Sequence, residues 1–292
     1  MHNAVSHNDP CASSEAIQFH YDVGNDFYQL WLDPTMTYSC AFWQGDENLE
    51  TAQRNKIDWH LQHSGIQPGE RLLEIGGGWG GLLDRAINHI GVKHATSLTL
   101  SQAQAEWIRN RQLPNVDVRL ESWFAHTPDT LYDGIVSVEA FEAFARPDQT
   151  DEEKLEGYKT FFQSCHRWLR PGGRLSLQTI TYEKLGRDWN HHISEKVFPD
   201  EDLPHLEEIV TAARGFFEIE LLRNDRAHYV RTLRCWLSNL RAKKSEAIEM
   251  VGAEKVAIYE KYLGLVLVGF YTGTMNLARI SLRRIDSRGG WS

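Results

Sequence analysis

A run of closely spaced glycines follows an acidic residue in the segment 74–81. Glu74 ends an apolar run, and Gly76, Gly78 and Gly80 occupy alternate positions after it. Glycine accepts a positive φ without penalty, and its missing side chain lets a bulky ligand approach the backbone closely. A dinucleotide site would space its glycines as G-x-G-x-x-G, and a phosphate loop would add Lys-Ser/Thr. The order E-x-G-x-G-x-G fits neither, so the turn predicts a different cofactor site.

A carboxylate in apolar surroundings is the second candidate for chemistry. Glu142 stands among Ala and Phe residues in the stretch FEAF at 141–144. We expect its side chain to be partly buried, and a buried carboxylate needs a partner or a purpose.

Alternating strands and helices must position these residues. Helices are predicted between the strands. The first follows the glycine turn and ends at about residue 90, the second runs through 107–113, and the third covers 152–169. Such alternation indicates a parallel sheet that binds ligands at the carboxyl ends of its strands. The rest comprises a mostly helical region at 15–63, segments 206–214 and 216–222, and long helices at 230–250 and 254–280. The strands are predicted at 71–75, 95–100, 116–120, 132–138 and 174–180.

The domain organisation follows from the same pattern. We expect a flexible N-terminus at 1–17 and a single domain over 18–292. Within that domain, residues 18–66 form a helical cover, and the polar segment 181–204 forms a lid after the fifth strand.

Composition excludes several classes of protein. The chain has 292 residues and a formal net charge of −9, which disfavours nucleic acid and mildly disfavours anionic membrane surfaces. No secretory signal or membrane-spanning run is visible. The four cysteines, at positions 11, 40, 165 and 235, show no metal-ligand spacing, so we expect reduced thiols, no metal and a cytoplasmic protein.

The glycine turn resembles motif I of class I S-adenosylmethionine (SAM) methyltransferases, in which the acid helps to position the amino-acid end of the cofactor. Three further stretches are HYDVGNDFY at 20–28, MTYSCAF at 36–42 and SVEAFEAF at 137–144. Together they resemble the cyclopropane fatty acid synthase and mycolic acid methyltransferase family over nearly the whole chain. The resemblance implies an α/β, Rossmann-like methyltransferase fold with a mostly parallel seven-stranded sheet and SAM as cofactor.

The resemblance also implies which residues contact SAM. Tyr38 and Ser39 would close over it, while Thr99 and Leu100 would face the ribose. Trp123 would stack on the adenine, with a purely structural tryptophan as the alternative. The full set is Tyr38, Ser39, Glu74, Gly76, Gly78, Gly80, Thr99, Leu100, Gln104, Ser122, Trp123 and Val138.

In this family a bicarbonate ion serves as the base. The resemblance places it on backbone amides and on side chains corresponding to Cys40, Glu142 and Tyr271, although Cys40 and Tyr271 also suit a structural core. The histidine usual at the end of the fifth strand is Gln178 here, and glutamine donates a hydrogen bond but does not titrate near neutral pH. We therefore expect an altered bicarbonate site, with a residue or a bound water removing the proton, and Tyr21 as a further candidate to help.

The function predicted from these residues is methylation of a carbon–carbon double bond through a carbocation, followed by proton loss or cyclisation. Because the segment 183–192 is polar and short, the predicted acceptor is a hydrophobic small molecule, a prenyl, terpenoid or other unsaturated chain of a natural-product type. Alternatives are a cyclopropane synthase acting on unsaturated acyl lipids, an N-methyltransferase of a small amine that uses His191 and His192, and a SAM-binding protein without catalysis. The sequence leaves homo-oligomerisation open.

Overall fold

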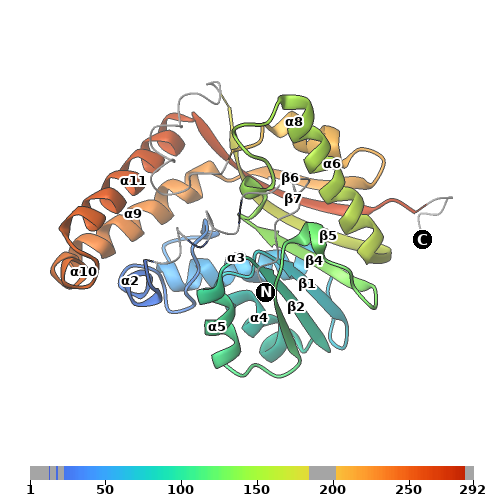
Figure 1. The fold of residues 1–292 in the computed structure, drawn as a ribbon, viewed down its shortest axis with the longest axis horizontal. Coiled ribbons are helices and arrows are strands. Elements are labelled where there is room, and N and C mark those ends of the chain that lie inside the picture. Colours follow the sequence, from blue (N-terminus) through green and yellow to red (C-terminus); the bar gives the residue numbers. More distant parts are fainter. Residues whose placement is uncertain (1–12, 14–17, 19–22, 184–201, 287–292) are drawn as a thin grey trace.

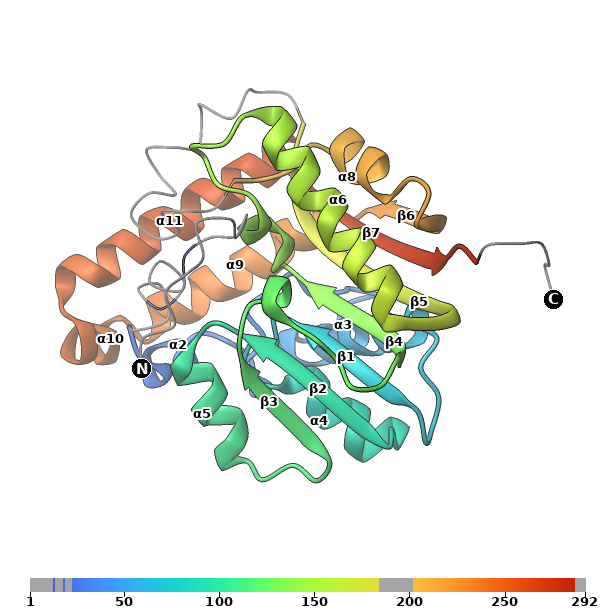
Figure 2. The ribbon, with the colours of Figure 1, turned by 45° about the vertical axis from the view of Figure 1, so that its right-hand side comes forward.

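A seven-stranded sheet forms the centre of the molecule. The computed structural model describes residues 13, 18, 23–183 and 202–286. The strand order is β3-β2-β1-β4-β5-β7-β6, in which β7 is antiparallel to both neighbours and the strands from β3 to β5 are parallel (Figure 2). This order confirms the predicted mostly parallel sheet. The strands are β1 (Arg71–Ile75), β2 (His94–Thr99), β3 (Val116–Leu120), β4 (Tyr132–Val138), β5 (Leu169–Tyr182), β6 (Phe217–Asn224) and β7 (Met275–Arg284).

Helices cover both faces of this sheet. Ile57 of α3 and Leu83 of α4 pack with Val136 of β4 in one core, whereas Phe161 of α6 and Ile209 of α8 belong to the core on the other face. The helices are α2 (Asn25–Gln29), α3 (Leu49–His63), α4 (Gly81–Arg85), α5 (Gln102–Asn110), α6 (Asp151–Trp168), α8 (Leu206–Ala213), α9 (Arg226–Ala242), α10 (Lys244–Val251) and α11 (Ala253–Thr272), with single turns η1 (Ala86–Ile90), η2 (Trp123–Ala125) and η3 (Phe141–Phe144).

Helices α9 and α11 lie side by side and extend away from the sheet, with α10 at their far end (Figure 1). Aromatic residues of α2 pack against this pair, since the Phe27 and Tyr259 rings lie 4.9 Å apart. None of the helices in the described ranges is long and apolar enough to cross a membrane.

The end of the chain corrects one prediction. The expected helix over 254–280 stops at Thr272, where Gly273 takes a left-handed conformation, and β7 begins at Met275. The residues of β7 from Met275 to Leu282 are all buried, the polar Arg279 and Ser281 included, and the apolar–polar alternation of the sequence changes phase at Ala278. The expected helix over 230–250 is likewise two helices, α9 and α10, which meet at Lys243.

The N-terminal cover is less helical than predicted. Residues 30–48, between α2 and α3, contain neither helix nor strand. The Asp33 carboxylate accepts hydrogen bonds from the Thr35 and Thr37 amides, and Gln53 of α3 donates to the Ser39 carbonyl at 2.8 Å. These contacts fix an irregular loop that carries residues 38–40 to the carboxyl ends of the strands. Most of the predicted lid, 184–201, lies outside the described residues.

Candidate functional site

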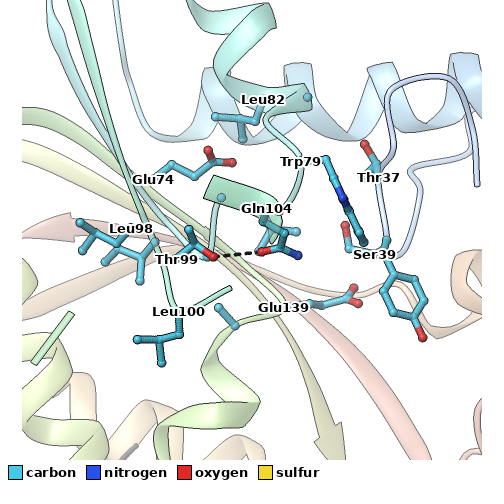
Figure 3. A pocket seen from close by; sticks show the side chains of 18 of the residues that line it. Thr37, Ser39, Glu74, Trp79, Leu82, Leu98, Thr99, Leu100, Gln104 and Glu139 are labelled. Atoms are coloured by element: carbon cyan, nitrogen blue, oxygen red, sulfur yellow. Dashed lines mark hydrogen bonds between the residues drawn. The ribbon is translucent and has the colours of Figure 1, made fainter. Parts of the chain in front are cut away.

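A cavity of about 150 Å³ lies at the carboxyl ends of β1, β2 and β4, and we call it the cofactor cavity (Figure 3). Gly80 is absent from its lining: it precedes α4, and a side chain there would meet Ile108 of α5 instead. The other residues that the resemblance assigns to SAM all line the cavity, namely Tyr38, Ser39, Glu74, Gly76, Gly78, Thr99, Leu100, Gln104, Ser122, Trp123 and Val138.

The glycine turn leaves room for a ligand against its backbone. Gly78 has φ +50°, and a Cβ built there would meet no atom within 4 Å, so that its missing side chain is open space in the cavity wall. At Gly77 the backbone is instead pressed against β2, where a Cβ would lie 1.9 Å from the Ser97 Oγ. The turn thus offers both the close packing and the open backbone that a bulky cofactor requires.

A carboxyl group, Glu74, and an amine, Lys56, face this cavity from two sides, and a ligand ammonium beside Glu74 would favour the charged form of this mainly neutral acid. Burial raises the pKa of Glu74 to about 8 and lowers the pKa of Lys56 to about 8. The Lys56 Nζ donates to the Ser39 Oγ at 2.7 Å, which ties α3 to the loop beside the cavity. A ligand with an ammonium and a carboxylate would find partners for both charges here, as the amino-acid end of SAM requires.

Aromatic and polar side chains line the cavity beside the ends of β2 and β3. The Thr99 hydroxyl donates to the Gln104 side-chain oxygen at 3.0 Å, which orders the end of β2 against α5 (Figure 3). The Trp123 ring lines the cavity and also packs 5.3 Å from the rings of Phe144 and Phe161. Trp123 is therefore a core residue that also forms part of the cavity wall, and its stacking on the adenine stays a prediction. Ser122 caps η2 by accepting from the Phe124 amide.

A second cavity of about 60 Å³ adjoins the first, and we call it the acceptor cavity. Tyr38 and Glu139 line both cavities, so the two are neighbours across these side chains. Apart from its two carboxylates, the wall of the acceptor cavity is aromatic or aliphatic and comes mainly from α9 and α11. Its lining residues are Tyr38, Glu139, Glu142, Ile180, Tyr229, Leu233, Trp236, Tyr262, Leu263 and Val266.

Glu142 is buried, as the sequence predicts, and only 4% of it is exposed. Its Oε1 accepts from the Ile180 amide at 2.6 Å, whereas Oε2 has no hydrogen-bond partner among the described residues. Burial, reinforced by the neighbouring Glu139, raises the pKa of Glu142 to about 8. The side chain is therefore mainly a neutral acid at pH 7.

Glu139 is a half-buried acid that sequence reasoning missed. It follows β4 with φ +48°, and its carboxylate accepts three hydrogen bonds. The Cys40 amide at 2.9 Å and the Gln178 side-chain amide at 2.6 Å donate to Oε1, while the Tyr229 hydroxyl donates to Oε2 at 2.6 Å. Burial raises the pKa of Glu139, but these donors act in the opposite direction by stabilising its charge.

Gln178 is held in one orientation by its other neighbours. The Arg279 Nε donates to the Gln178 Oε1 at 2.7 Å, and because a guanidinium only donates, the amide nitrogen must face Glu139. The His60 Nε2 lies 3.0 Å from the same oxygen and must then carry its proton, which leaves Nδ1 to accept from Ser176. Burial lowers the pKa of His60 well below its usual range, so its ring is neutral.

The structure places two of the predicted catalytic residues, Cys40 and Tyr271, differently from what the sequence suggests. The Cys40 thiol is buried, which raises its pKa to about 12, and Cys40 reaches Glu139 through its backbone amide. The predicted place of Tyr271 beside Cys40 and Glu142 is wrong, because Tyr271 is 65% exposed and lines neither cavity. Tyr229 of α9 is the tyrosine that reaches the carboxylates. Tyr21 lies outside the described residues.

The missed residues left weak signals in the sequence. Gln53, Lys56 and His60 recur at helical spacing on α3, and all three are buried. Tyr229 and Thr232 belong to a similar stripe on α9, where the Thr232 hydroxyl accepts from the Ala41 amide. A polar stripe at helical spacing reads as a solvated face, and only the packing of α3 and α9 onto the 30–48 loop shows that these stripes face inward.

Known proteins resemble this chain over most of its length. The profile of the mycolic acid cyclopropane synthetase family matches residues 9–280. The S-adenosylmethionine-dependent methyltransferase UmaA of Mycobacterium tuberculosis is 36% identical over 294 residues, which cover 92% of this chain and 97% of UmaA. Cyclopropane mycolic acid synthase 2 of Mycobacterium leprae is 37% identical over 272 residues, which cover 85% of this chain and 87% of that enzyme.

A solved structure agrees with the sequence comparisons. The mycolic acid cyclopropane synthase CmaA1, in complex with SAH and CTAB, superposes with a TM-score of 0.83 at 32% identity. The match covers 94% of this chain and 99% of CmaA1.

Proposed function

The chain belongs to the mycolic acid cyclopropane synthetase family of SAM-dependent methyltransferases, and from that premise we propose that it methylates a carbon–carbon double bond in a long unsaturated acyl chain. The observation that carries this proposal is the pair of adjoining cavities that share Tyr38 and Glu139. One cavity suits the cofactor, and the other offers an acceptor an apolar wall from α9 and α11. A hydrocarbon chain in the second cavity would present its double bond at the shared wall.

The residues of the cofactor cavity fit SAM at each of its parts. Lys56 and Glu74 would face the carboxylate and the ammonium, and Thr99 and Gln104 lie where the ribose is expected. SAM supplies an electrophilic methyl group. The chain must hold that methyl group in line with the acceptor and exclude water from the reaction.

Aromatic rings surround the place where positive charge would develop. Methylation of an alkene leaves a carbocation, and the faces of aromatic rings stabilise a cation through their quadrupole. Tyr38 and Trp236 line the acceptor cavity with ring centroids 5.2 Å apart, and Tyr229 lies on its polar side. These rings stabilise the cation without forming a covalent bond to it, whereas an amine would trap it.

Among the predicted acceptors, an acyl chain is better supported than a prenyl chain. The relatives found above include a cyclopropane mycolic acid synthase, and CmaA1 was crystallised with CTAB, an amphiphile with a single alkyl chain. The prediction of a smaller, natural-product acceptor relied on the segment 183–192, most of which lies outside the described residues. The comparisons do not support that acceptor class.

A panel of acceptors tests the proposal. The purified protein is incubated with SAM that carries a deuterated methyl group and with an oleoyl lipid, its saturated stearoyl counterpart, a prenyl diphosphate or a small amine. We expect SAH release and a labelled product from the oleoyl lipid alone. Loss of one deuterium identifies ring closure or a methylene group, whereas full retention identifies proton loss from the acyl chain. Methylation of the amine alone, or of the prenyl diphosphate alone, contradicts the proposal.

A further inference from the structure

Glu139 holds a backbone conformation that costs free energy. A non-glycine residue in the left-handed region is strained, and such strain persists only where the surroundings impose it. Here φ is +48°, directly after β4 and at the wall between the two cavities. The Glu139 amide is also bound, since it donates to the Gln178 carbonyl at 2.8 Å. The strained residue therefore holds its carboxylate at the wall between the two cavities, where a group could contact both ligands.

The donors around Glu139 form a preorganised anion site. The Cys40 amide, the Gln178 amide and the Tyr229 hydroxyl all point at its carboxylate within 2.9 Å. Arg279 fixes two of them, because it donates to the Gln178 oxygen and, at 3.1 Å, to the Cys40 carbonyl. Such a donor set suits one carboxylate-sized anion, and the chain itself provides that anion.

Bicarbonate does not fit beside this carboxylate. The family resemblance implies a bicarbonate ion near Cys40 and Glu142, yet the donors available there are engaged by Glu139. Two like charges side by side in a buried site repel each other, because little solvent screens them. A bicarbonate bound here would face Glu139 directly and would press Glu142 further toward its neutral form.

We propose that the Glu139 carboxylate is the catalytic base and takes the place of bicarbonate, so that the reaction needs no added bicarbonate. The proposal rests on the proposed methylation of an alkene. The π electrons of the double bond form a C–C bond to the methyl carbon as the S–CH₃ bond breaks, with its electron pair staying on sulfur. Glu139 then takes a proton from the new methyl group or from a neighbouring carbon. The freed C–H electron pair closes the ring or forms a new double bond, and Glu139 later releases the proton to solvent.

The ionisation states of the two acids agree with this role. Glu139 accepts three hydrogen bonds and so is best satisfied as a carboxylate, whereas Glu142 accepts one from Ile180 and is neutral at pH 7. When two acids lie this close together, ionisation of one disfavours ionisation of the other. Glu139 would then be the ionised base, and Glu142 would stay neutral beside it. Lys56 and Arg279 contribute positive charge nearby, which balances Glu139 and Asp225.

Substitutions at Glu139 test the proposal in buffer depleted of bicarbonate and in buffer supplemented with it. We expect wild-type turnover to be equal in both. Glu139→Gln should lose about 100-fold or more in kcat in both, the usual contribution of a general base. Glu139→Gly, which relieves the backbone strain and vacates the donors, should lose as much in depleted buffer and recover with bicarbonate. The exposed Glu249→Gln on α10 is the matched control and should behave as wild type.

Two binding measurements separate this proposal from a loss of structure and from the proposed function. Calorimetry should show that every variant still binds SAH, with a change in affinity far smaller than the change in kcat. Carbon-13 NMR should show labelled bicarbonate bound to Glu139→Gly but not to the wild type, whether or not any acceptor is methylated. Bicarbonate binding or bicarbonate-dependent turnover in the wild type, or full turnover of Glu139→Gly in depleted buffer, overturns the proposal. Absence of product from every unsaturated chain with the wild type contradicts the proposed function instead.

Discussion

The cofactor cavity and the acceptor cavity are built in different ways. The first takes most of its wall from short continuous segments that follow β1, β2 and β4, including the whole turn 76–79. The second takes single residues from β5, α9 and α11, which lie far apart in the sequence. A site made of continuous segments can be found from local sequence, whereas a site made of single residues depends on how distant helices pack.

The two cavities also differ in charge. Lys56 and Glu74 place an amine and a carboxyl group on the wall of the cofactor cavity, and a zwitterionic ligand end would favour the charged form of both. The acceptor cavity holds two acids, Glu139 and Glu142, in an apolar wall. The first arrangement binds a charged ligand, whereas the second suits proton removal from an uncharged one.

The largest expected effect comes from closing the cofactor cavity. Gly78→Val should lower SAH affinity by at least about 100-fold, because the side chain would enter the open space beside the turn and a β-branched residue tolerates φ +50° poorly. Isothermal calorimetry measures the affinity. Gly215→Val imposes the same kind of strain at φ +86°, in a turn between α8 and β6, and should bind SAH normally. Equal losses in both variants would mean that strain alone, rather than the filled cavity, is responsible.

The next effect isolates the polar side of the acceptor cavity. Tyr229→Phe removes one hydrogen bond to the Glu139 carboxylate, worth about 1.5–3 kcal/mol for a charged acceptor, so kcat should fall about 10- to 100-fold. Losing this donor also raises the pKa of Glu139, so the acidic limb of the pH–rate profile should move to higher pH. SAH affinity should not change.

Tyr271→Phe is the matched control for this prediction, because Tyr271 is 65% exposed. Its turnover and pH profile should equal those of the wild type. A loss in Tyr271→Phe with normal turnover in Tyr229→Phe would restore the role that the sequence assigned to Tyr271.

The same contrast explains which parts could be predicted from the sequence. The bounds of β1, β3 and β4 match the prediction because apolar runs bounded by turn residues mark them locally. β7 was missed because its apolar–polar alternation changes phase at Ala278, so that the segment does not show one continuous strand pattern.

Within the site, most predicted cofactor residues other than Gly80 line one cavity because they lie at or just after the carboxyl ends of β1 to β4, while Tyr38 and Ser39 reach it from the loop before α3. Glu139 lies directly after β4, within the stretch 137–144 that carries part of the family resemblance. That stretch also contains Glu142, and the residue types alone do not show which of the two carboxyl groups accepts the hydrogen bonds. Tyr229 and Arg279 meet Glu139 and Gln178 only through the packing of α9 and β7 on the sheet. That contact carries no local signal.

A smaller effect concerns the apolar side of the acceptor cavity. Val266→Phe adds volume to a wall residue of α11 and should raise KM for an unsaturated acyl substrate about 10-fold while SAH affinity stays constant. Val268→Phe makes the same change on the same helix at a residue that is 47% exposed, so its KM should not change. Steady-state kinetics with an oleoyl lipid measure both. An unchanged KM in Val266→Phe would place the acceptor elsewhere.

The smallest effect is the pH dependence of stability that Glu142 confers. Its pKa is about 8 in the folded chain and about 4.3 when unfolded, so the folded state binds more protons between these values. The free energy of unfolding must therefore fall as pH rises from about 5 to about 8. Glu142→Gln does not titrate, and its amide oxygen still accepts from Ile180. The variant should match the wild type at pH 5 and exceed its Tm by several degrees at pH 9, on the order of a few kcal/mol.

Differential scanning calorimetry across this pH range measures the difference. Glu74 and Glu139 also have raised pKa values, but they titrate in both proteins, so the comparison isolates the titration of Glu142 together with its coupling to Glu139. The exposed Glu249→Gln should show a constant difference from the wild type at every pH. A constant difference for Glu142→Gln as well would mean that Glu142 stays ionised in the folded chain. The acceptor cavity would then hold two negative charges, on Glu139 and Glu142. It would differ from the cofactor cavity, with its amine and carboxyl group, in net charge and not in how many protons its acids bind.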